Sequence, residues 1–152
     1  VVSPDSGRVR VADIWADRLG APLAIVHKRR DPDVPNQVTA HELVGDVQGR
    51  TCLLVDDMID TAGTIVAAAK ALKANGAAKV IVAATHAVFS HPAAERLSSG
   101  VVDEVLVTNT LPLRPDQMFD NLTVISVAPL IASAIKAVFG DDSVNKLFPG
   151  HA

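Results

Sequence analysis

The sequence predicts an α/β fold in which a mostly parallel, twisted sheet of about five strands is flanked by helices. Short β-branched runs alternate with alanine-rich stretches of helical character, which is the order of consecutive strand–helix–strand units. Hydrophobic residues make up 49% of the chain and aromatic residues only 3%, which favours a core of Val, Ala, Leu and Ile. At 152 residues, the chain is expected to form one domain spanning residues 1–152.

The expected elements follow one another in a regular order along the chain. Strands are predicted at about 22–27, 51–55, 79–84, 103–107 and 122–126. Helices are predicted at about 8–19, 64–75, 91–98 and 127–139, and Asn75-Gly76 is expected to end the second helix. The charged, proline-containing residues 28–36 are expected to form a mobile loop, followed by an extended arm over Gln37–Val44.

Composition argues against several classes of partner. A formal net charge of −3 with few aromatic residues gives neither a basic face nor a stacking platform, so no nucleic-acid partner is expected. No run of about 18 apolar residues could span a bilayer, so no membrane partner is expected either. The single cysteine, Cys52, lies in an apolar run and is expected to be a buried thiol in a reducing cytoplasm.

The segment with the clearest chemical signal is the turn that follows the 51–55 strand. Its small and hydroxyl-bearing residues let the backbone close around an anion, so that main-chain N–H groups can donate to phosphate oxygens. The positive end of the following helix adds to this. The residues concerned are Asp60, Thr61, Ala62, Gly63 and Thr64. The alternative is that Asp60 and Thr61 merely cap the helix. The spacing and the lysine of a Walker loop are missing.

Asp56 and Asp57 stand directly before this turn and need an explanation of their own. Carboxylates beside a phosphate site would repel the ligand unless they accept hydrogen bonds from sugar hydroxyls or neutralise a divalent cation. A phosphorylated sugar handled together with Mg²⁺ would supply both. The alternative is an ordinary solvated turn.

The stretch from Val55 to Thr64 resembles the phosphoribosyl pyrophosphate loop of type I phosphoribosyltransferase folds. Together with Ser3–Gly7, Lys28–Arg30 and Ser143–Phe148, it resembles the ribose-phosphate pyrophosphokinase family over essentially the whole chain. That family joins two related α/β domains, transfers the β,γ-diphosphoryl group of ATP to the C1 hydroxyl of ribose 5-phosphate, and needs Mg²⁺. The resemblance is to the C-terminal domain, and the opening residues, a strand without a preceding Met, fit a start within a longer protein.

The resemblance also implies roles for individual residues. Lys28 and Arg30 would be catalytic residues of the mobile loop, with Arg30 also binding substrate, and Asp5 would belong to a metal site. Ribose 5-phosphate would be bound by Asp56, Asp57, Asp60, Thr61, Ala62, Gly63 and Thr64. The ATP site would lie in a missing N-terminal domain, and the complete enzyme would be a homo-oligomer, which in this family is a hexamer.

The chemistry of the two basic residues can be argued separately. Diphosphoryl transfer concentrates negative charge on the β-phosphoryl oxygens, so cations on a closing loop would stabilise the transition state. The alternative for Lys28 and Arg30 is a solvated charge run. Three positions depart from the family pattern: Arg8 replaces a second glycine, His27 replaces an Asp, and Asn145 replaces a Ser.

Two other functions stay open at this point. A phosphoribosyltransferase would need a hood that recognises a base, and no aromatic side chain is placed for stacking. A non-catalytic phosphoribosyl sensor is disfavoured by the two basic residues of the loop.

Among the remaining residues, His86 either approaches a ligand or, as we expect, bonds to backbone groups. Trp15 is expected in the core or at a domain contact, and the helix over 127–139 in the core or at a subunit contact.

Overall fold

A computed structural model describes residues 1–30 and 38–147, and it leaves the side chains of residues 28–30 and 38–41 undescribed. In this part of the chain, seven strands form one sheet in the order β3-β2-β1-β4-β5-β6-β7. Their bounds are Val2–Ser3 (β1), Ala24–Arg30 (β2), Val38–Val44 (β3), Thr51–Ile59 (β4), Lys79–Ala87 (β5), Glu104–Thr108 (β6) and Leu122–Ile125 (β7). Neighbouring strands are parallel except for β2 and β3. The predicted fold class is confirmed, and the expected opening strand and extended arm join the five other expected strands in the sheet as β1 and β3.

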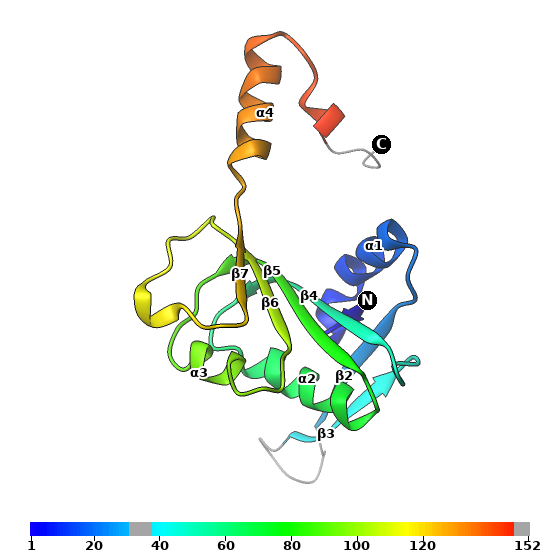
Figure 1. The fold of residues 1–152 in the computed structure, drawn as a ribbon. Helices are drawn as coiled ribbons and strands as arrows, with labels where there is room; N and C mark the ends of the chain where they lie inside the picture. The colour runs from blue at the N-terminus through cyan, green and yellow to red at the C-terminus, as the bar shows by residue number, and fades with distance from the viewer. Residues whose placement is uncertain (31–37, 148–152) are drawn as a thin grey trace.

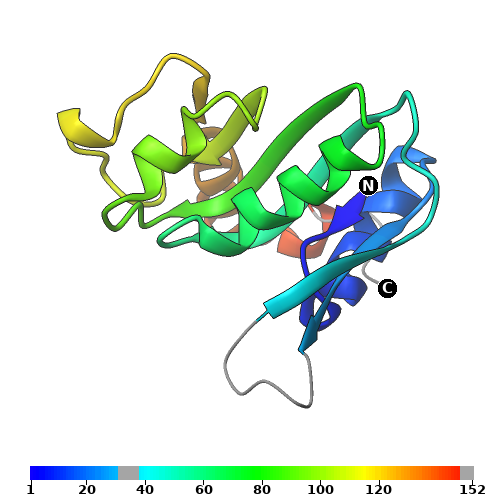
Figure 2. The ribbon, with the colours of Figure 1, turned by 90° about the horizontal axis from the view of Figure 1, so that it is seen from below.

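The helices fall where the sequence places them, within a few residues. They are α1 (Val9–Leu19), α2 (Gly63–Ala74), α3 (Ala93–Leu97) and α4 (Ala128–Phe139), with 3-10 turns η1 (Ser6–Arg8), η2 (Pro115–Gln117) and η3 (Val144–Leu147). Gly76, with φ +86°, ends α2 as expected. α2 and α3 lie on one face of the sheet and α1 on the other (Figures 1 and 2). Within the described ranges, no helix has both the length and the apolar character needed to cross a bilayer.

The core lies between the sheet and α2. Alternate residues of the central strands, such as Leu54, Val82 and Val105, are completely buried on this side, and Leu72 of α2 packs among them. Their neighbours in sequence, such as Leu106, are only half-buried, because α1 covers just part of the opposite face. The buried position expected for Cys52 is confirmed.

Three strands, β2, β4 and β5, run past their predicted ends. β4 continues to Ile59 because β5 runs beside it as a pairing partner as far as Ala87, so Asp56 and Asp57 belong to a strand and not to a turn. β2 continues to Arg30 because it pairs antiparallel with β3. Placing Lys28 and Arg30 in a loop was therefore wrong for the backbone. Residues 31–36 of the expected loop lie outside the described residues.

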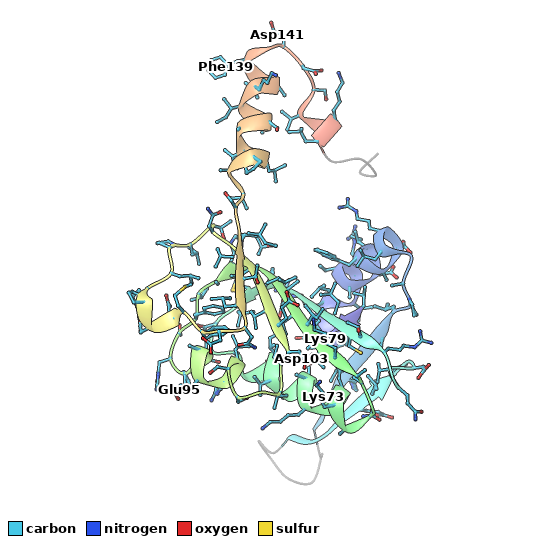
Figure 3. All side chains as sticks on the ribbon, in the orientation of Figure 1. Lys73, Lys79, Glu95, Asp103, Phe139 and Asp141 are labelled. Atoms are coloured by element: carbon cyan, nitrogen blue, oxygen red, sulfur yellow. The ribbon has the colours of Figure 1, made fainter. Side chains whose placement is uncertain are left out.

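Of the two positions predicted for α4, the core and a subunit contact, the core is wrong. The helix stands away from the sheet and contacts η3, and Phe139 at its end is 88% exposed (Figures 1 and 3). Leu130, Ile131 and Ile135 of the same helix are exposed as well. Trp15, at 42% exposed, is not a core residue either. The domain or subunit contacts predicted for these side chains stay predictions.

Candidate functional site

The turn between β4 and α2 has the form expected of an anion site. Ala62 precedes α2 in the left-handed conformation, with φ 60°, and no side chain caps the helix. The capping role considered for Asp60 and Thr61 is therefore wrong. A left-handed alanine costs on the order of 1 kcal/mol, and such strain is typical of ligand-binding turns. The first N–H groups of α2 have no helical partner of their own and are available to a ligand.

A cavity of about 180 Å³ opens over this turn. It is lined by Asp56, Met58, Ile59, Asp60, Thr61, Ala62, Gly63, Thr64 and Ile65. The structure thus brings together the predicted substrate-binding residues except Arg30, whose side chain is not described, and Asp57. Asp57 lines a neighbouring cavity of about 280 Å³ with Trp15 and the uncovered sheet face. Asp56 lines both cavities and lies between the turn and that face.

Arg96 of α3 is a site residue that the sequence did not reveal. Its Nη1 donates to the carbonyl oxygen of Thr61 at 2.9 Å, across 35 residues of chain. A Cβ added to Gly63 would lie 3.5 Å from the same nitrogen. A cation therefore stands beside the anion-binding turn. Nothing in the local sequence around Arg96 signals this, because the contact depends on how α3 is placed relative to the turn.

The two carboxylates before the turn share one arginine. Arg8 Nε lies 3.2 Å from Asp56 Oδ1, and Arg8 Nη2 donates to Asp57 Oδ2 at 2.7 Å. Burial raises the pKa of Asp56 to about 6, although the hydrogen bond from the Asp57 backbone N–H and the charge of Arg8 oppose this rise. At Asp57 desolvation raises the pKa, but hydrogen bonding with Asp56 and the charge of Arg8 outweigh it, so the pKa is lowered. The pair therefore takes up a proton more readily at Asp56 than at Asp57.

Asp5 lies in the short loop after β1, three residues before the Arg8 that contacts Asp56 and Asp57. Its Oδ1 accepts hydrogen bonds from the backbone N–H groups of Gly7 and Arg8, at 2.8 and 3.1 Å. Among the described residues, no group of three or more His, Cys, Asp or Glu side chains is arranged to hold a metal ion. Mg²⁺ is often bound by one or two carboxylates together with substrate phosphates. Asp5 fits that type of site as a single protein ligand.

For Lys28 and Arg30 the structure gives only the backbone position, and for His86 it gives one side-chain contact. Lys28 and Arg30 occupy the carboxyl end of β2, which runs parallel to β1, so both positions belong to the sheet edge that carries the Asp5 loop. Their side chains lie outside the described residues. His86 belongs to β5, and its Nδ1 lies 2.9 Å from Thr110 Oγ1, so its partner is a hydroxyl and not the expected backbone group.

Comparisons with known proteins identify relatives of this chain. Residues 32–149 match the family described as phosphoribosyl synthetase-associated domain. A ribose-phosphate pyrophosphokinase of Streptomyces coelicolor is 66% identical over 148 residues, which are 97% of this chain and 46% of the relative. The enzyme of the same name from Mycobacterium bovis is 61% identical over 153 residues, covering 100% of this chain and 47% of the relative.

A solved structure gives the same result for the fold. The crystal structure of phosphoribosylpyrophosphate synthetase from Mycobacterium smegmatis matches with a TM-score of 0.83 and 55% sequence identity, over 92% of this chain and 44% of that one. The chain thus spans about half the length of the relatives it matches. The resemblance to ribose-phosphate pyrophosphokinases that the motifs indicate is confirmed, and the chain belongs to the phosphoribosyl synthetase-associated domain family.

Proposed function

We propose that this chain supplies the ribose 5-phosphate half-site of a ribose-phosphate diphosphokinase, which transfers the β,γ-diphosphoryl group of ATP to the C1 hydroxyl of the sugar. The observation that carries the proposal is the uncapped start of α2, opening into a cavity beside two carboxylates. The names of the relatives support it. Neither a base-binding hood nor a second phosphate turn is needed to explain these features.

Each part of the site has a separate task in this proposal. The N–H groups after Ala62, with the hydroxyls of Thr61 and Thr64, bind the 5-phosphate, and hydrogen bonds to a charged group contribute about 1.5–3 kcal/mol each. Asp56 and Asp57 accept hydrogen bonds from sugar hydroxyls. Lys28 and Arg30 stabilise the charge that develops on the transferred group. Asp5 would hold Mg²⁺ when the substrates are bound, and that ion would neutralise phosphate charge.

The ATP site belongs, in this proposal, to a further domain that precedes these residues in the complete enzyme. Three observations support a missing half: the chain spans about half of its relatives, the sheet face beside Trp15 is uncovered, and α4 exposes apolar side chains. Contacts between domains and between subunits would bury these surfaces. The complete enzyme would then be a homo-oligomer, and the resemblance to the family implies a hexamer. In this proposal the complete enzyme acts in nucleotide biosynthesis in the cytoplasm.

A binding experiment tests the half-site. Ribose 5-phosphate is titrated into the isotope-labelled chain while the backbone amide resonances are followed. We expect the largest shifts over Asp60–Thr64, because the donors converge there. If these amides stay still while others move, the proposed site is wrong.

An activity experiment tests the reaction. The 152-residue chain and a version extended by the upstream half are assayed with ATP, Mg²⁺, phosphate and ribose 5-phosphate. We expect synthesis of phosphoribosyl pyrophosphate from the extended chain only. Comparable turnover by the short chain would overturn the placement of the ATP site. Turnover with phosphoribosyl pyrophosphate and a nucleobase would instead identify a phosphoribosyltransferase, and binding without turnover by either chain would identify a sensor.

A further inference from the structure

The feature that the proposed function leaves unexplained is the arginine between the two sugar-binding carboxylates. Asp56 and Asp57 are consecutive residues of β4, and successive side chains of a strand ordinarily point to opposite faces. Here a single guanidinium reaches both carboxylates, at 3.2 and 2.7 Å. Arg8 therefore holds the two carboxylates together on one side of the cavity edge.

The arginine is itself fixed by a chain of hydrogen bonds. Ser3, which is completely buried, donates from its hydroxyl to the carbonyl oxygen of Asp5 at 2.6 Å. The carboxylate of Asp5 in turn binds the backbone N–H of Arg8. A Cβ on Gly7 would lie 3.2 Å from Asp5 Oδ1, so a larger residue there would have to displace this carboxylate slightly. These hydrogen bonds fix the backbone at Arg8, and the two carboxylates are the partners of its guanidinium.

The charge balance explains what such an arginine is for. Two carboxylates beside a phosphate dianion repel it unless a cation is present. Asp56 has only 14% of its side chain exposed, so solvent screens it poorly. Exposed ion pairs contribute little to stability, but a guanidinium that bridges two carboxylates fixes both their charge and their direction.

We propose that Arg8 is a positioning residue of the sugar site, which neutralises Asp56 and Asp57 and aims them at the ribose hydroxyls in place of a divalent cation. The inference rests on the proposed function, since it assigns the pair to ribose 5-phosphate. In this inference, Asp56 and Asp57 bind the sugar without a metal ion, and Asp5 is the residue that would hold Mg²⁺. Without the Arg8 guanidinium, another cation would have to balance the charges of Asp56 and Asp57. Sugar binding should then depend on Mg²⁺.

The test measures ribose 5-phosphate affinity of the complete enzyme by calorimetry, without nucleotide, with and without Mg²⁺. Arg8→Gln keeps much of the side-chain length but removes the charge, and we expect the affinity to fall about tenfold or more. Arg8→Lys should recover part of the loss, and Mg²⁺ should recover part of it for Arg8→Gln while leaving the wild type unchanged. Arg114→Gln, which breaks a comparable arginine–carboxylate pair with Asp116, is the matched control and should bind normally.

A double-mutant cycle keeps the inference testable if Arg8→Gln lowers the stability of the loop. If Arg8 acts through the carboxylates, its replacement should cost much less affinity in an Asp57→Asn background than in the wild type. Equal losses in both backgrounds, unchanged affinity in Arg8→Gln, or a loss that neither lysine nor Mg²⁺ restores would each overturn the inference. Failure of the wild type to bind ribose 5-phosphate would instead contradict the proposed function.

Discussion

Arg96 Nη1 donates a hydrogen bond to the carbonyl oxygen of Thr61 at 2.9 Å, and this contact ties α3 to the turn at which α2 begins. The bond pairs a carbonyl oxygen of the turn with a guanidinium group. It also places a positive charge beside the proposed phosphate position. A carbonyl oxygen turned toward a phosphate would repel it, so the arginine acts on the site in two ways.

Arg96→Ala should therefore weaken ribose 5-phosphate binding. We expect an increase in Kd of about tenfold, the effect of losing one charge-assisted interaction. Arg96→Lys should retain the charge and part of the affinity. Glu95→Ala, on the same short helix (Figure 3), is the control for the integrity of α3 and should leave Kd unchanged. An unaltered Kd in Arg96→Ala would exclude a role for this side chain in binding.

Gly63→Ala should separate binding from folding. The added Cβ would lie 3.5 Å from Arg96 Nη1 and 3.8 Å from Thr61 Oγ1, which are ordinary contact distances, so the fold has room for it. The free energy of unfolding should change by less than about 0.5 kcal/mol. Because the methyl group would occupy space at the proposed phosphate position, the affinity for ribose 5-phosphate should drop sharply. Thermal unfolding and calorimetry measure the two effects, and normal affinity would move the phosphate site elsewhere.

Asp56 makes folding stability depend on pH in a direction opposite to that of most carboxylates. Its pKa of about 6 in the folded chain exceeds the ordinary value of 3.8, so the folded state binds the proton more tightly than the unfolded state. The stabilisation is complete below about pH 4 and is lost as the pH rises through 6. Ionised Asp56 then costs on the order of 2 kcal/mol at pH 8.

Asp56→Asn should consequently raise the melting temperature at pH 8 and flatten its dependence on pH between about 4 and 7. Asp46→Asn is the control, because the pKa of that exposed carboxyl is lowered by hydrogen bonds from the Gln48 backbone and Arg50. It should give no stabilisation at pH 8. A melting temperature at pH 8 that is unchanged or lower in Asp56→Asn would contradict the raised pKa.

The basic residues at the end of β2 should act on the rate and not on sugar binding. In the complete enzyme, Lys28→Ala or Arg30→Ala is expected to lower kcat about 100-fold while changing KM for ribose 5-phosphate little, since in the proposed function both would contact charge that develops in the transition state. Arg29→Ala removes the same charge from the intervening position and is the matched control. A higher KM with an unchanged kcat would show that the two residues bind the ground-state substrate instead. An equal fall in kcat for Arg29→Ala would show that only the net charge of the segment matters.

The sequence alone predicted the architecture and most of the residues at the candidate site. The alternation of β-branched and alanine-rich runs is a local signal, and parallel strands with helical connections satisfy it in few ways. The motif from Asp56 to Thr64 is contiguous, and all of its residues except Asp57 line one cavity. Local patterning therefore sufficed for most of the sheet, the helices and the turn between β4 and α2.

What only the tertiary structure decided depends on contacts between distant segments. β4 and β2 run past their predicted ends because neighbouring strands provide backbone partners there, which no local propensity encodes. The exposure of α4 reflects the lack of a surface to pack against within the described chain. Arg8 and Arg96 join the site from 49 and 35 residues away, and such pairings arise when packing brings charges together, so sequence spacing does not reveal them.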